Sequence, residues 1–243
     1  MFKSAKFSLS NGRLEEFAGI YGLIFNNQTF IILFCGIATY VGRQSSTVIN
    51  MIGEVAGRLH HRGPDGSGAF HIGSTVLAHR RLSIIDIAGG KQPLHNEVGD
   101  LALVCNGEIY NHERLRRKLQ DRHRFRTHSD SEVFLHLYED LGPASVTKLD
   151  GMFAFVLSDG KQVFAARDPL GIKPLYTGRD ADDGLWFASE LKALIDVCAS
   201  IEEVPPGAAY AGGTVWSSCC KWARIQEAYQ VIATTGFKTQ GPI

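Results

Sequence analysis

Five short segments of the chain hold residue types that are suited to chemistry on a carbonyl carbon. They are residues 35–37 (CGI), 61–65 (HRGPD), 81–84 (RLSI), 106–111 (NGEIYN) and 129–130 (SD). A thiol such as that of Cys35 is the best available side chain for attack on an amide carbon. A side-chain amide followed by a glycine N–H, as in Asn106-Gly107, can donate hydrogen bonds to an oxyanion. An arginine can hold a carboxylate through two hydrogen bonds, and a carboxylate can hold an ammonium group.

Each of these residues also has a simpler structural interpretation when it is taken alone. Cys35 would be a buried strand cysteine, and Arg81 a surface arginine or one half of a salt bridge. Asn106-Gly107 would be a hairpin turn, which is the stronger prediction for that dipeptide in isolation. Asp130 would be the N-cap of a helix, a role that it could combine with ligand binding. A catalytic site is therefore indicated only because the five segments occur together.

The 243-residue chain has 25 Lys and Arg residues against 25 Asp and Glu residues, so its formal net charge is zero. This balance argues against a general nucleic-acid or membrane-surface binder, because both depend on surplus positive charge. Hydrophobic residues make up 44% and charged residues 21%, which is typical of a globular protein with one large domain or two small ones. The five cysteines form no CxxC pair, and the nine histidines have no metal-binding spacing. We expect neither a disulfide framework nor a bound metal, and a reducing compartment is favoured.

Residues 17–42 carry no charge, which raises the question of a signal peptide or a membrane span. The polar residues 26–29 (NNQT) divide this stretch into two pieces that are each too short to cross a membrane. Arg13, Glu15 and Glu16 do not form the basic segment of a signal peptide, and no small-residue cleavage site stands out. The second apolar piece is rich in Ile, Phe and Tyr, so it is better explained as a buried strand.

The rest of the chain has the pattern of a mixed helix-and-strand protein. A helix is predicted from residue 45 to about 59, where polar residues can cap it and four apolar residues fall on one face. Further helices are predicted at 112–119, 130–141 and 190–194, and strands at 74–78, 82–87 and 101–105. Hairpins are predicted around the turns 158–161 and 179–184. The short connections between antiparallel runs indicate an α+β fold rather than a doubly wound parallel sheet.

Taken in order, the five segments resemble the glutaminase domain of glutamine-hydrolysing asparagine synthetase. That domain is a class II glutamine amidotransferase and a member of the N-terminal-nucleophile (Ntn) hydrolases. Residues 167–176 (RDPLGIKPLY) and 187–194 (FASELKAL) extend the resemblance, which covers about residues 35–210. CGI is a weak motif by itself, whereas HRGPD followed by RLSI, NGEIYN and RDPLGIKPLY is specific. NGEIYN also favours the asparagine synthetase branch over the amidotransferases of purine or glucosamine synthesis.

The resemblance implies a four-layer α/β/β/α sandwich of two mostly antiparallel sheets, and it implies a role for each site residue. Cys35 would be the nucleophile, and Asn106 with Gly107 would form the oxyanion hole. Arg81 would bind the carboxylate of the substrate. The remaining residues implied to bind substrate are Leu82, Ser83, Ile84, Ile85, Glu108 and Asp130. Arg62 and Asp65 are expected to shape their loop rather than to take part in chemistry.

Cys35 is preceded by 34 residues, with Phe34 directly before it. In the family this cysteine normally follows the initiator methionine, and its own α-amino group, with a pKa of about 8, serves as the base. An internal Cys35 has an amide nitrogen there, which cannot accept a proton. Residues 1–34 are therefore expected to be either a propeptide, which some class II amidotransferases remove themselves, or an artefact of gene prediction. Lipid attachment to Cys35 fits poorly, because a bulky residue precedes it.

The expected division is an extension (1–34), a type-2 glutamine amidotransferase domain (35–210) and a divergent C-terminal tail (211–243). The family's synthetase half would bind ATP and aspartate through an SGGxDS loop. The nearest string, residues 211–218 (AGGTVWSS), lacks the aspartate and is predicted to be a hairpin, and residues 221–233 are predicted to form a helix. No cofactor is expected in this chain, because ATP and Mg would belong to the synthetase half.

The predicted activity is hydrolysis of L-glutamine to glutamate and ammonia through a thioester on Cys35, with the ammonia destined for asparagine synthesis. The expected partners are L-glutamine and a separate synthetase chain, with a homodimer as a further option and the cytosol as the location; neither nucleic acid nor a membrane is expected. One alternative is a non-catalytic protein that keeps the pocket to bind glutamine or a partner, because Cys35 is not N-terminal. Another amidotransferase glutaminase is a second alternative, against which NGEIYN argues.

Overall fold

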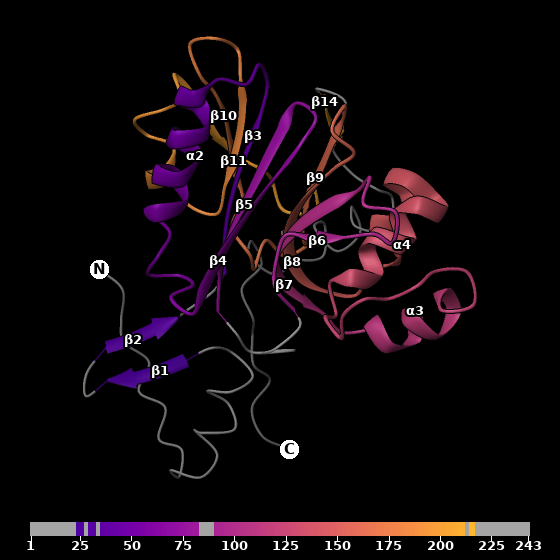
Figure 1. Cartoon of the computed structure of the whole chain (residues 1–243). Helices are drawn as coiled ribbons and strands as arrows, with labels where there is room; N and C mark the ends of the chain where they lie inside the picture. The colour runs from indigo at the N-terminus through magenta and orange to yellow at the C-terminus, as the bar shows by residue number, and fades with distance from the viewer. Residues whose placement is uncertain (1–22, 27–28, 33–34, 83–89, 212–213, 217–243) are drawn as a thin grey trace, which may run out of the picture.

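Two six-stranded antiparallel sheets packed face to face form the centre of the molecule (Figure 1). The computed structural model describes residues 23–26, 29–32, 35–82, 90–211 and 214–216. The first sheet has the order β12 (Ser200–Glu203), β10 (Tyr176–Arg179), β11 (Leu185–Ala188), β3 (Gly36–Val41), β5 (Thr75–Arg81) and β4 (Gly66–Ile72). The second has the order β14 (Thr214–Trp216), β13 (Ala209–Ala211), β9 (Val163–Arg167), β8 (Gly151–Ser158), β7 (Ala102–Ile109) and β6 (Leu94–His95).

Helices cover the outer face of each sheet. Helix α2 (Ser46–Gly57) lies on the first sheet, and α3 (His112–Leu119) and α4 (Glu132–Leu141) lie on the second (Figure 1). Two 3₁₀ turns, η1 (Gly142–Lys148) and η2 (Leu191–Ala193), complete the helical elements of the described residues. The resulting order of layers is helix, sheet, sheet, helix. The predicted α+β class and four-layer sandwich are therefore confirmed.

Three apolar cores separate the four layers, because successive side chains of a strand point to opposite faces. In β8, Ala154 and Val156 face the first sheet, whereas Phe153, Phe155 and Leu157 face α4. The inner strands are thus buried on both faces, which explains why their sequences are continuous apolar runs rather than alternating ones. Large aromatic residues fill the outer core of the second sheet, and small residues such as Ala154 allow the two sheets to approach.

The residues at the start of α2 determine where this helix begins. The side chain of Ser45 accepts a hydrogen bond from the backbone N–H of Val48 (3.2 Å), which satisfies one of the free donors of the first turn. Ile52 and Val55 on the inner face of the helix are buried against the first sheet, and Leu59 just beyond its end joins them. The predicted helix and its apolar face are both confirmed.

Most other predicted elements also have the expected positions. Helix 112–119 and the hairpins around 158–161 and 179–184 are confirmed, and the string 211–218 begins as the β13–β14 hairpin. The predicted helix at 190–194 is only the short turn η2. The predicted strand at 82–87 falls mainly outside the described residues, and Leu82 is not in a strand. The predicted helix at 221–233 also lies outside them.

The apolar N-terminal stretch forms strands. Strands β1 (Leu23–Asn26) and β2 (Thr29–Ile32) pair antiparallel in a small sheet of their own, with Asn26 opposite Thr29. Asn26 and Thr29, at the two ends of the polar break, are thus the last pair of these strands. The second apolar piece continues into β3, a central and buried strand of the first sheet, as predicted. No helix in the described ranges is long and apolar enough to cross a membrane.

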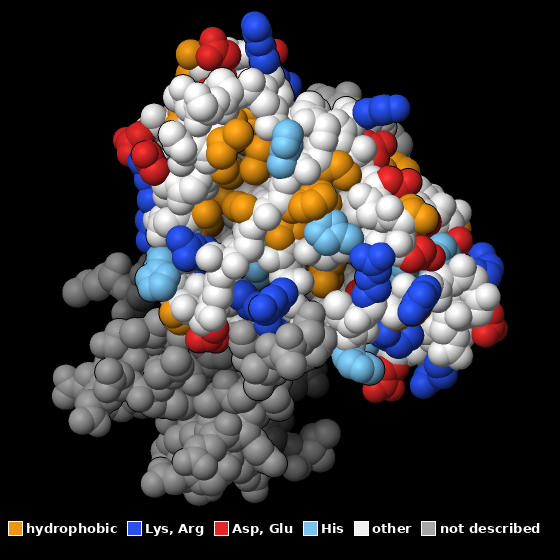
Figure 2. Space-filling view, in the orientation of Figure 1, with side chains coloured by type: hydrophobic (Ala, Val, Ile, Leu, Met, Phe, Trp, Pro, Cys, Tyr) orange, Lys and Arg blue, Asp and Glu red, His pale blue; other side chains and the backbone are white. Residues whose placement is uncertain are grey.

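An apolar hollow opens on the surface between α2 and strands β4 and β5. Hydrophobic side chains gather in this region of the face that Figure 2 shows. The hollow has a volume of about 440 Å³, and its lining includes Ile49, Ile52, Phe70 and Val76. It lies on the outer side of the first sheet, whereas the polar pocket described below lies where the two sheets meet.

The aromatic core of the second sheet gives a first testable prediction. Phe155 is almost fully buried, and its ring centroid lies 4.1 Å from that of Phe134 on α4. We expect Phe155→Ala to lower the free energy of unfolding by about 3–5 kcal/mol, since it removes buried apolar surface and leaves a cavity under α4. Urea unfolding measures this loss. The control Val98→Ala, at a side chain that is 72% exposed, should change stability by less than about 0.5 kcal/mol.

Candidate active site

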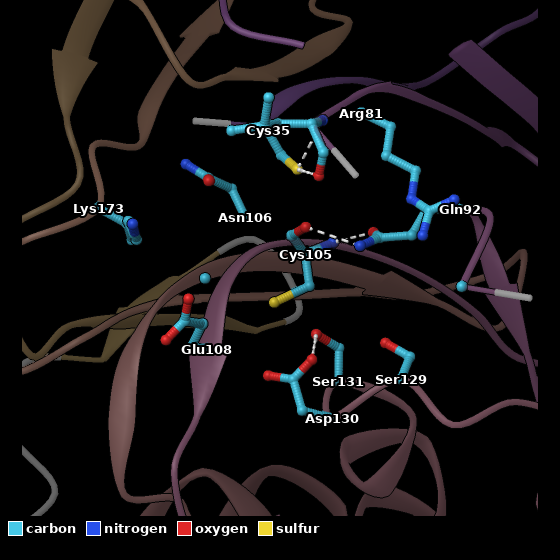
Figure 3. Close-up of a pocket in the computed structure, with 13 residues that line it drawn as sticks. Cys35, Arg81, Gln92, Cys105, Asn106, Glu108, Ser129, Asp130, Ser131 and Lys173 are labelled. Carbon is cyan, nitrogen blue, oxygen red and sulfur yellow. Dashed lines mark hydrogen bonds between the residues drawn. The ribbon is translucent and has the colours of Figure 1, made fainter. Parts of the chain in front are cut away.

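A small polar cavity of about 70 Å³ lies where the start of β3, the end of β5 and the second half of β7 come together (Figure 3). Residues from six separate parts of the sequence line it: Cys35, Arg81, Leu82, Gly90, Gln92, Cys105, Asn106, Gly107, Glu108, Ser129, Asp130, Ser131 and Lys173. Every predicted site residue that the structure describes is in this set. Ser83, Ile84 and Ile85 lie outside the described residues.

Cys35 is held at the mouth of the pocket by the backbone of Leu82. The Leu82 N–H donates to Cys35 Sγ at 3.3 Å, and the thiol donates to the Leu82 carbonyl oxygen at 3.6 Å. The contact follows from the pairing of β3 with β5, in which Gly36 is opposite Arg80. A Cβ on Gly36 would lie 2.8 Å from Leu59 Cβ, so the glycine lets β3 begin close to the end of the α2 segment.

Two distant motifs meet behind Cys35. Arg62 of HRGPD donates from Nε to the Cys35 carbonyl oxygen (3.1 Å) and from Nη1 to Glu190 Oε1 (2.8 Å). Glu190, of FASELKAL, also contacts His61 (2.9 Å) and Lys192 (3.0 Å). The expectation that Arg62 shapes its loop is too narrow, because Arg62 also fixes the backbone of the predicted nucleophile.

The Cys35 thiol is protonated in this environment. Burial raises its pKa, although the Leu82 N–H and the positive charges of Arg81, Lys173 and Arg62 act in the opposite direction. A thiol is a far weaker nucleophile than a thiolate. Attack by Cys35 therefore needs a base that takes its proton during the reaction.

Asn106 and Gly107 lie inside strand β7, so the hairpin-turn interpretation of this dipeptide is wrong. A Cβ on Gly107 would lie 2.2 Å from the Met152 carbonyl oxygen, so the close approach of β8 requires the glycine. Asn106 is buried at 2% exposure, and its Nδ2 has no hydrogen-bond partner. A buried N–H₂ group without a partner is costly in a folded protein. It leaves a hydrogen-bond donor available at the pocket that contains Cys35.

Asp130 does not cap α4, which corrects the helix-cap interpretation. The N-cap of α4 is Ser131, and the Asp130 carboxylate instead accepts a hydrogen bond from the Ile109 N–H at 2.6 Å. This bond joins the start of α4 to the end of β7. Burial raises the pKa of Asp130, and it also raises that of Glu108, which the nearby charge of Lys173 partly opposes.

Lys173 lines the pocket, although the sequence analysis gave it no role. It is only 3% exposed, and burial lowers its pKa to about 8 despite the nearby Glu108 carboxylate. The preceding loop positions it: Asp168 accepts backbone N–H bonds from Leu170, Ile172 and Lys173 at 2.9–3.1 Å. The sequence signal for Lys173 was its place at the end of residues 167–173 (RDPLGIK). Nothing in that loop indicates that the lysine side chain lines this pocket.

Gln92 is a second pocket residue that the sequence analysis missed. Its side-chain amide pairs with the backbone of Cys105, donating to the carbonyl oxygen (2.9 Å) and accepting from the N–H (2.6 Å; Figure 3). It thereby holds the loop before β6 against β7. Ser129 and Ser131, which flank Asp130, also line the pocket. Nothing in the local sequence marks Gln92, because its partner is a backbone group of another strand.

The fold and the pocket together define a cysteine-containing Ntn-type sandwich. The glutamine amidotransferase domain family model matches residues 34–211. The chain belongs to this family.

The curated relatives are asparagine synthetases. Asparagine synthetase [glutamine-hydrolyzing] 2 of Arabidopsis thaliana is 51% identical over 180 residues, which cover 72% of this chain and 31% of that protein. The probable asparagine synthetase [glutamine-hydrolyzing] of Dictyostelium discoideum is 45% identical over 179 residues, covering 71% of this chain and 32% of that protein. The predicted resemblance to the glutaminase region of asparagine synthetase is confirmed. The chain spans about a third of the length of these relatives.

Solved structures show the same fold. Glutamine phosphoribosylpyrophosphate amidotransferase from B. subtilis matches with a TM-score of 0.63 and 23% identity, over 76% of this chain and 49% of that one. A structure described as the allosteric regulatory enzyme of purine biosynthesis matches with a TM-score of 0.62 and 25% identity, over 73% and 46%. These matches support the sandwich architecture of two antiparallel sheets.

The ion pairs behind Cys35 give a prediction for stability against pH. Burial opposes ionisation of Glu190, but hydrogen bonds from Arg62, Lys192 and His61 outweigh it and lower the pKa of Glu190 from 4.5 to about 2. A lowered pKa means that its contribution is present above pH 4.5 and is lost as the pH falls toward 2. We expect the stability difference between the wild type and Glu190→Gln to shrink over that interval, as measured by urea unfolding. The exposed control Glu113→Gln should show no such trend, and a constant difference for Glu190→Gln would contradict the assignment.

Proposed function

We propose that this chain hydrolyses L-glutamine to glutamate and ammonia through a γ-glutamyl thioester on Cys35. The observation that carries the proposal is the buried, unpartnered Nδ2 of Asn106 in the same small pocket as the Cys35 thiol. An oxyanion that forms during attack on the glutamine amide would give this donor its missing acceptor. The family match and the glutamine-hydrolysing relatives agree with this chemistry.

The distribution of charge in the pocket suits an amino-acid substrate. Arg81 and Lys173 lie close enough to Cys35 to act on its pKa, and Glu108 and Asp130 act on one another. Glutamine has a carboxylate and an ammonium group at one end and an uncharged amide at the other. Arg81 would hold the carboxylate, and the two acidic residues would take the ammonium group. The uncharged amide would then point toward Cys35 and Asn106.

The reaction proceeds in two stages. In the first, Cys35 Sγ forms a bond to the amide carbon, and the C–N bond breaks as ammonia leaves with the proton that the thiol gave up. In the second, water attacks the thioester carbon, the C–S bond breaks, and glutamate and the thiol are restored. The oxygen carries negative charge in both stages, so the Asn106 amide and the Gly107 N–H would act twice.

The base for these proton transfers is the α-amino group of Cys35 itself. In the chain with residues 1–34 attached, this nitrogen is an amide bonded to Phe34 and cannot accept a proton. The family match begins at residue 34, next to the same bond. Activity on this proposal therefore requires cleavage between Phe34 and Cys35.

A catalytically inactive, glutamine-binding protein is the alternative, because Cys35 is bonded to Phe34 in the full chain. The glutamine-hydrolysing names of the relatives do not favour it. The same pocket charges would then serve binding alone.

The use of the released ammonia, the partner chain and the cellular compartment are further proposals. The relatives are named as asparagine synthetases, and this chain aligns to about a third of their length. We place the released ammonia in asparagine synthesis, with an ATP- and Mg-dependent synthetase region on a separate chain, in the cytosol. A homodimer of this chain is a further option. Co-purification of a synthetase chain with the tagged protein from its own cells tests the partnership.

Exposure of Cys35 gives the first prediction for activity. We expect a chain that begins at Cys35 to release glutamate from glutamine at least about 10²-fold faster than the chain with an uncut 1–34 segment, because only the former has a basic amine. N-terminal sequencing and intact mass establish the start of each sample. Cys35→Ala in the same shortened chain is the control and should be inactive.

The outcomes separate the two candidates. Equal activity of the cut and uncut chains would contradict the assignment of the base. Glutamine binding by the shortened chain without any turnover would support the binding protein.

Asn106 gives the second prediction. In the chain that begins at Cys35, Asn106→Ala should lower kcat for glutamine hydrolysis by about 10²–10³ with a smaller effect on KM, because the donor acts mainly on the transition state. Steady-state assays of glutamate release measure both constants. Gln120→Ala, which removes an amide from the exposed end of α3, is the matched control and should leave both unchanged. An unaltered kcat in Asn106→Ala would remove Asn106 from the oxyanion hole.

A further inference from the structure

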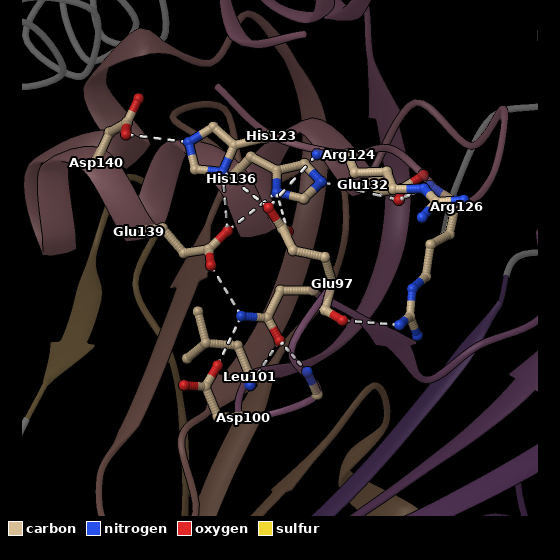
Figure 4. A network of polar contacts seen from close by, with 12 residues as sticks. Glu97, Asp100, Leu101, His123, Arg124, Arg126, Glu132, His136, Glu139 and Asp140 are labelled. Carbon is tan, nitrogen blue, oxygen red and sulfur yellow. Dashed lines mark hydrogen bonds and ion pairs between the residues drawn. The ribbon is translucent and has the colours of Figure 1, made fainter. Parts of the chain in front are cut away.

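A second cluster of chemically versatile side chains lies in the helical layer outside the second sheet (Figure 4). It consists of Glu97 from the segment after β6, His123 from the segment after α3, and His136 and Glu139 from α4. One ligand atom from each of the four residues lies within 4.8 Å of all the others. No metal was expected from the sequence, because none of the histidines has a metal-binding spacing; the four residues come from three separate segments.

Four contacts within the cluster are close in length to the ligand separations of a tetrahedral metal site, with Glu97 using a different oxygen toward each histidine. His123 Nδ1 lies 3.5 Å from Glu97 Oε1 and 3.4 Å from Glu139 Oε2. His136 Nδ1 lies 3.3 Å from Glu97 Oε2 and 2.9 Å from Glu139 Oε2. Ligands bound to Zn²⁺ at 2.0–2.1 Å in a tetrahedron are about 3.3–3.4 Å apart. The four ligand atoms, which lie within 4.8 Å of one another, would have to move closer together, to separations of about 3.4 Å, to surround one ion.

Both imidazole rings present the same nitrogen to the cluster and have an acidic group behind the other nitrogen. His123 Nε2 lies 3.0 Å from Asp140 Oδ1, and His136 Nε2 lies 3.8 Å from Glu132 Oε1. Glu139 is supported as well, since its Oε1 accepts a hydrogen bond from Asn96 at 2.8 Å. Such carboxylates behind metal-bound histidines fix the ring orientation and increase the basicity of the ligand.

Two observations favour a metal over an ion-pair network of protonated histidines. The rings of His123 and His136 lie with centroids 4.8 Å apart, so two imidazolium charges would repel each other in a largely buried place. Glu97 Oε2 is buried at the cluster and makes no hydrogen bond, and His136 Nδ1, 3.3 Å away, forms an ion pair with it only when the ring is protonated. A cation at the centre would remove the repulsion and bind this oxygen while both rings stay neutral.

The local charge also suits a divalent ion. Four carboxylates, those of Glu97, Glu132, Glu139 and Asp140, surround the two histidines. Arg122 lies 2.7 Å from Asp140, and Arg116 lies 3.9 Å from Glu132. Two of the four negative charges are thus offset by arginines, and neutral histidines leave two more for the ion to balance.

We propose that Glu97, His123, His136 and Glu139 bind one divalent transition-metal ion of the zinc type. Two imidazoles and two carboxylates in a compact tetrahedral arrangement suit Zn²⁺, whereas Mg²⁺ takes six oxygen ligands. All four first ligands come from the protein, so the site is structural rather than catalytic. It joins α4 to the segments after β6 and α3, outside the Cys35 pocket.

Metal binding to the full chain tests the proposal. After treatment with a chelator, Zn²⁺ titrated by calorimetry should bind with a stoichiometry of one, and added Zn²⁺ should raise the Tm. Co²⁺ should give the visible absorption of a tetrahedral site, and Mg²⁺ should not compete. His123→Gln should abolish this saturable binding.

Asp140, whose carboxylate contacts His123 Nε2, provides the most specific test of the site. Asp140→Asn keeps the side-chain volume and does not touch the ion, and we expect a loss of Zn²⁺ affinity of about 10–100-fold. Circular dichroism checks that each variant is folded. His71→Gln, at an exposed histidine outside the cluster, and Cys35→Ala should both bind Zn²⁺ as the wild type does. Because Cys35→Ala removes the glutaminase nucleophile, failure of the metal site and failure of the proposed activity are separable.

Two results would contradict the proposed metal site. Absence of one-to-one Zn²⁺ binding by the folded wild type would overturn the proposal. So would Zn²⁺ binding that persists unchanged in folded His123→Gln, because the ion would then be held elsewhere, for example by cysteines.

Discussion

A buried hydrogen bond between the two sheets holds together the strands that line the pocket. His79 of β5 is almost completely buried, and its Nε2 bonds to the carbonyl oxygen of Cys105 in β7 at 3.1 Å. Burial lowers the pKa of His79 to about 4, and its Nδ1 has no partner, so the ring is neutral with its proton on Nε2. Arg81, two residues further along β5, and Asn106, next to Cys105 in β7, both line the cavity. A change in the spacing of the sheets at this bond would move Arg81 relative to the amide donor of Asn106.

Individual helices and strands of this protein could be predicted because apolar periodicity is a local property, whereas the four-layer arrangement was implied by the family resemblance. Helix 112–119 and both hairpins follow from alternation and turn residues within a few positions. Misassignments occurred where a distant partner overrides a local preference. Asn106-Gly107 favours a turn in isolation, but pairing with β8, some 45 residues later, keeps it in a strand. Asp130 has the type and position of a helix cap, but the Ile109 N–H competes for its carboxylate.

The site residues can likewise be divided into those that the sequence predicts and those that depend on distant contacts. Residue types and motif order were sufficient to predict the group that contains Cys35, Arg81 and Asn106, since the resemblance fixed their roles together. Gln92 and Lys173 were not predicted, because their positions depend on which loops fold back over β7. The histidine-carboxylate cluster was missed for a related reason: only the packing of α4 against two preceding segments brings its members together. Sequence spacing describes a ligand set well when the ligands share one element, and poorly when three segments contribute.

The small β1–β2 hairpin is separate from the two large sheets in its strand pairing, and this bears on the bond between Phe34 and Cys35. Among the strands that the structure describes, β1 and β2 pair only with each other, and neither contributes a hydrogen bond to the edge of a six-stranded sheet. Both large sheets thus have the same strand partners whether or not the hairpin is attached. Backbone pairing therefore does not join the hairpin to either large sheet, and a lone two-stranded hairpin adds little stability of its own. Cleavage before Cys35 would leave the strand order of the sandwich unchanged, so maturation at this bond would need no rearrangement of the two sheets.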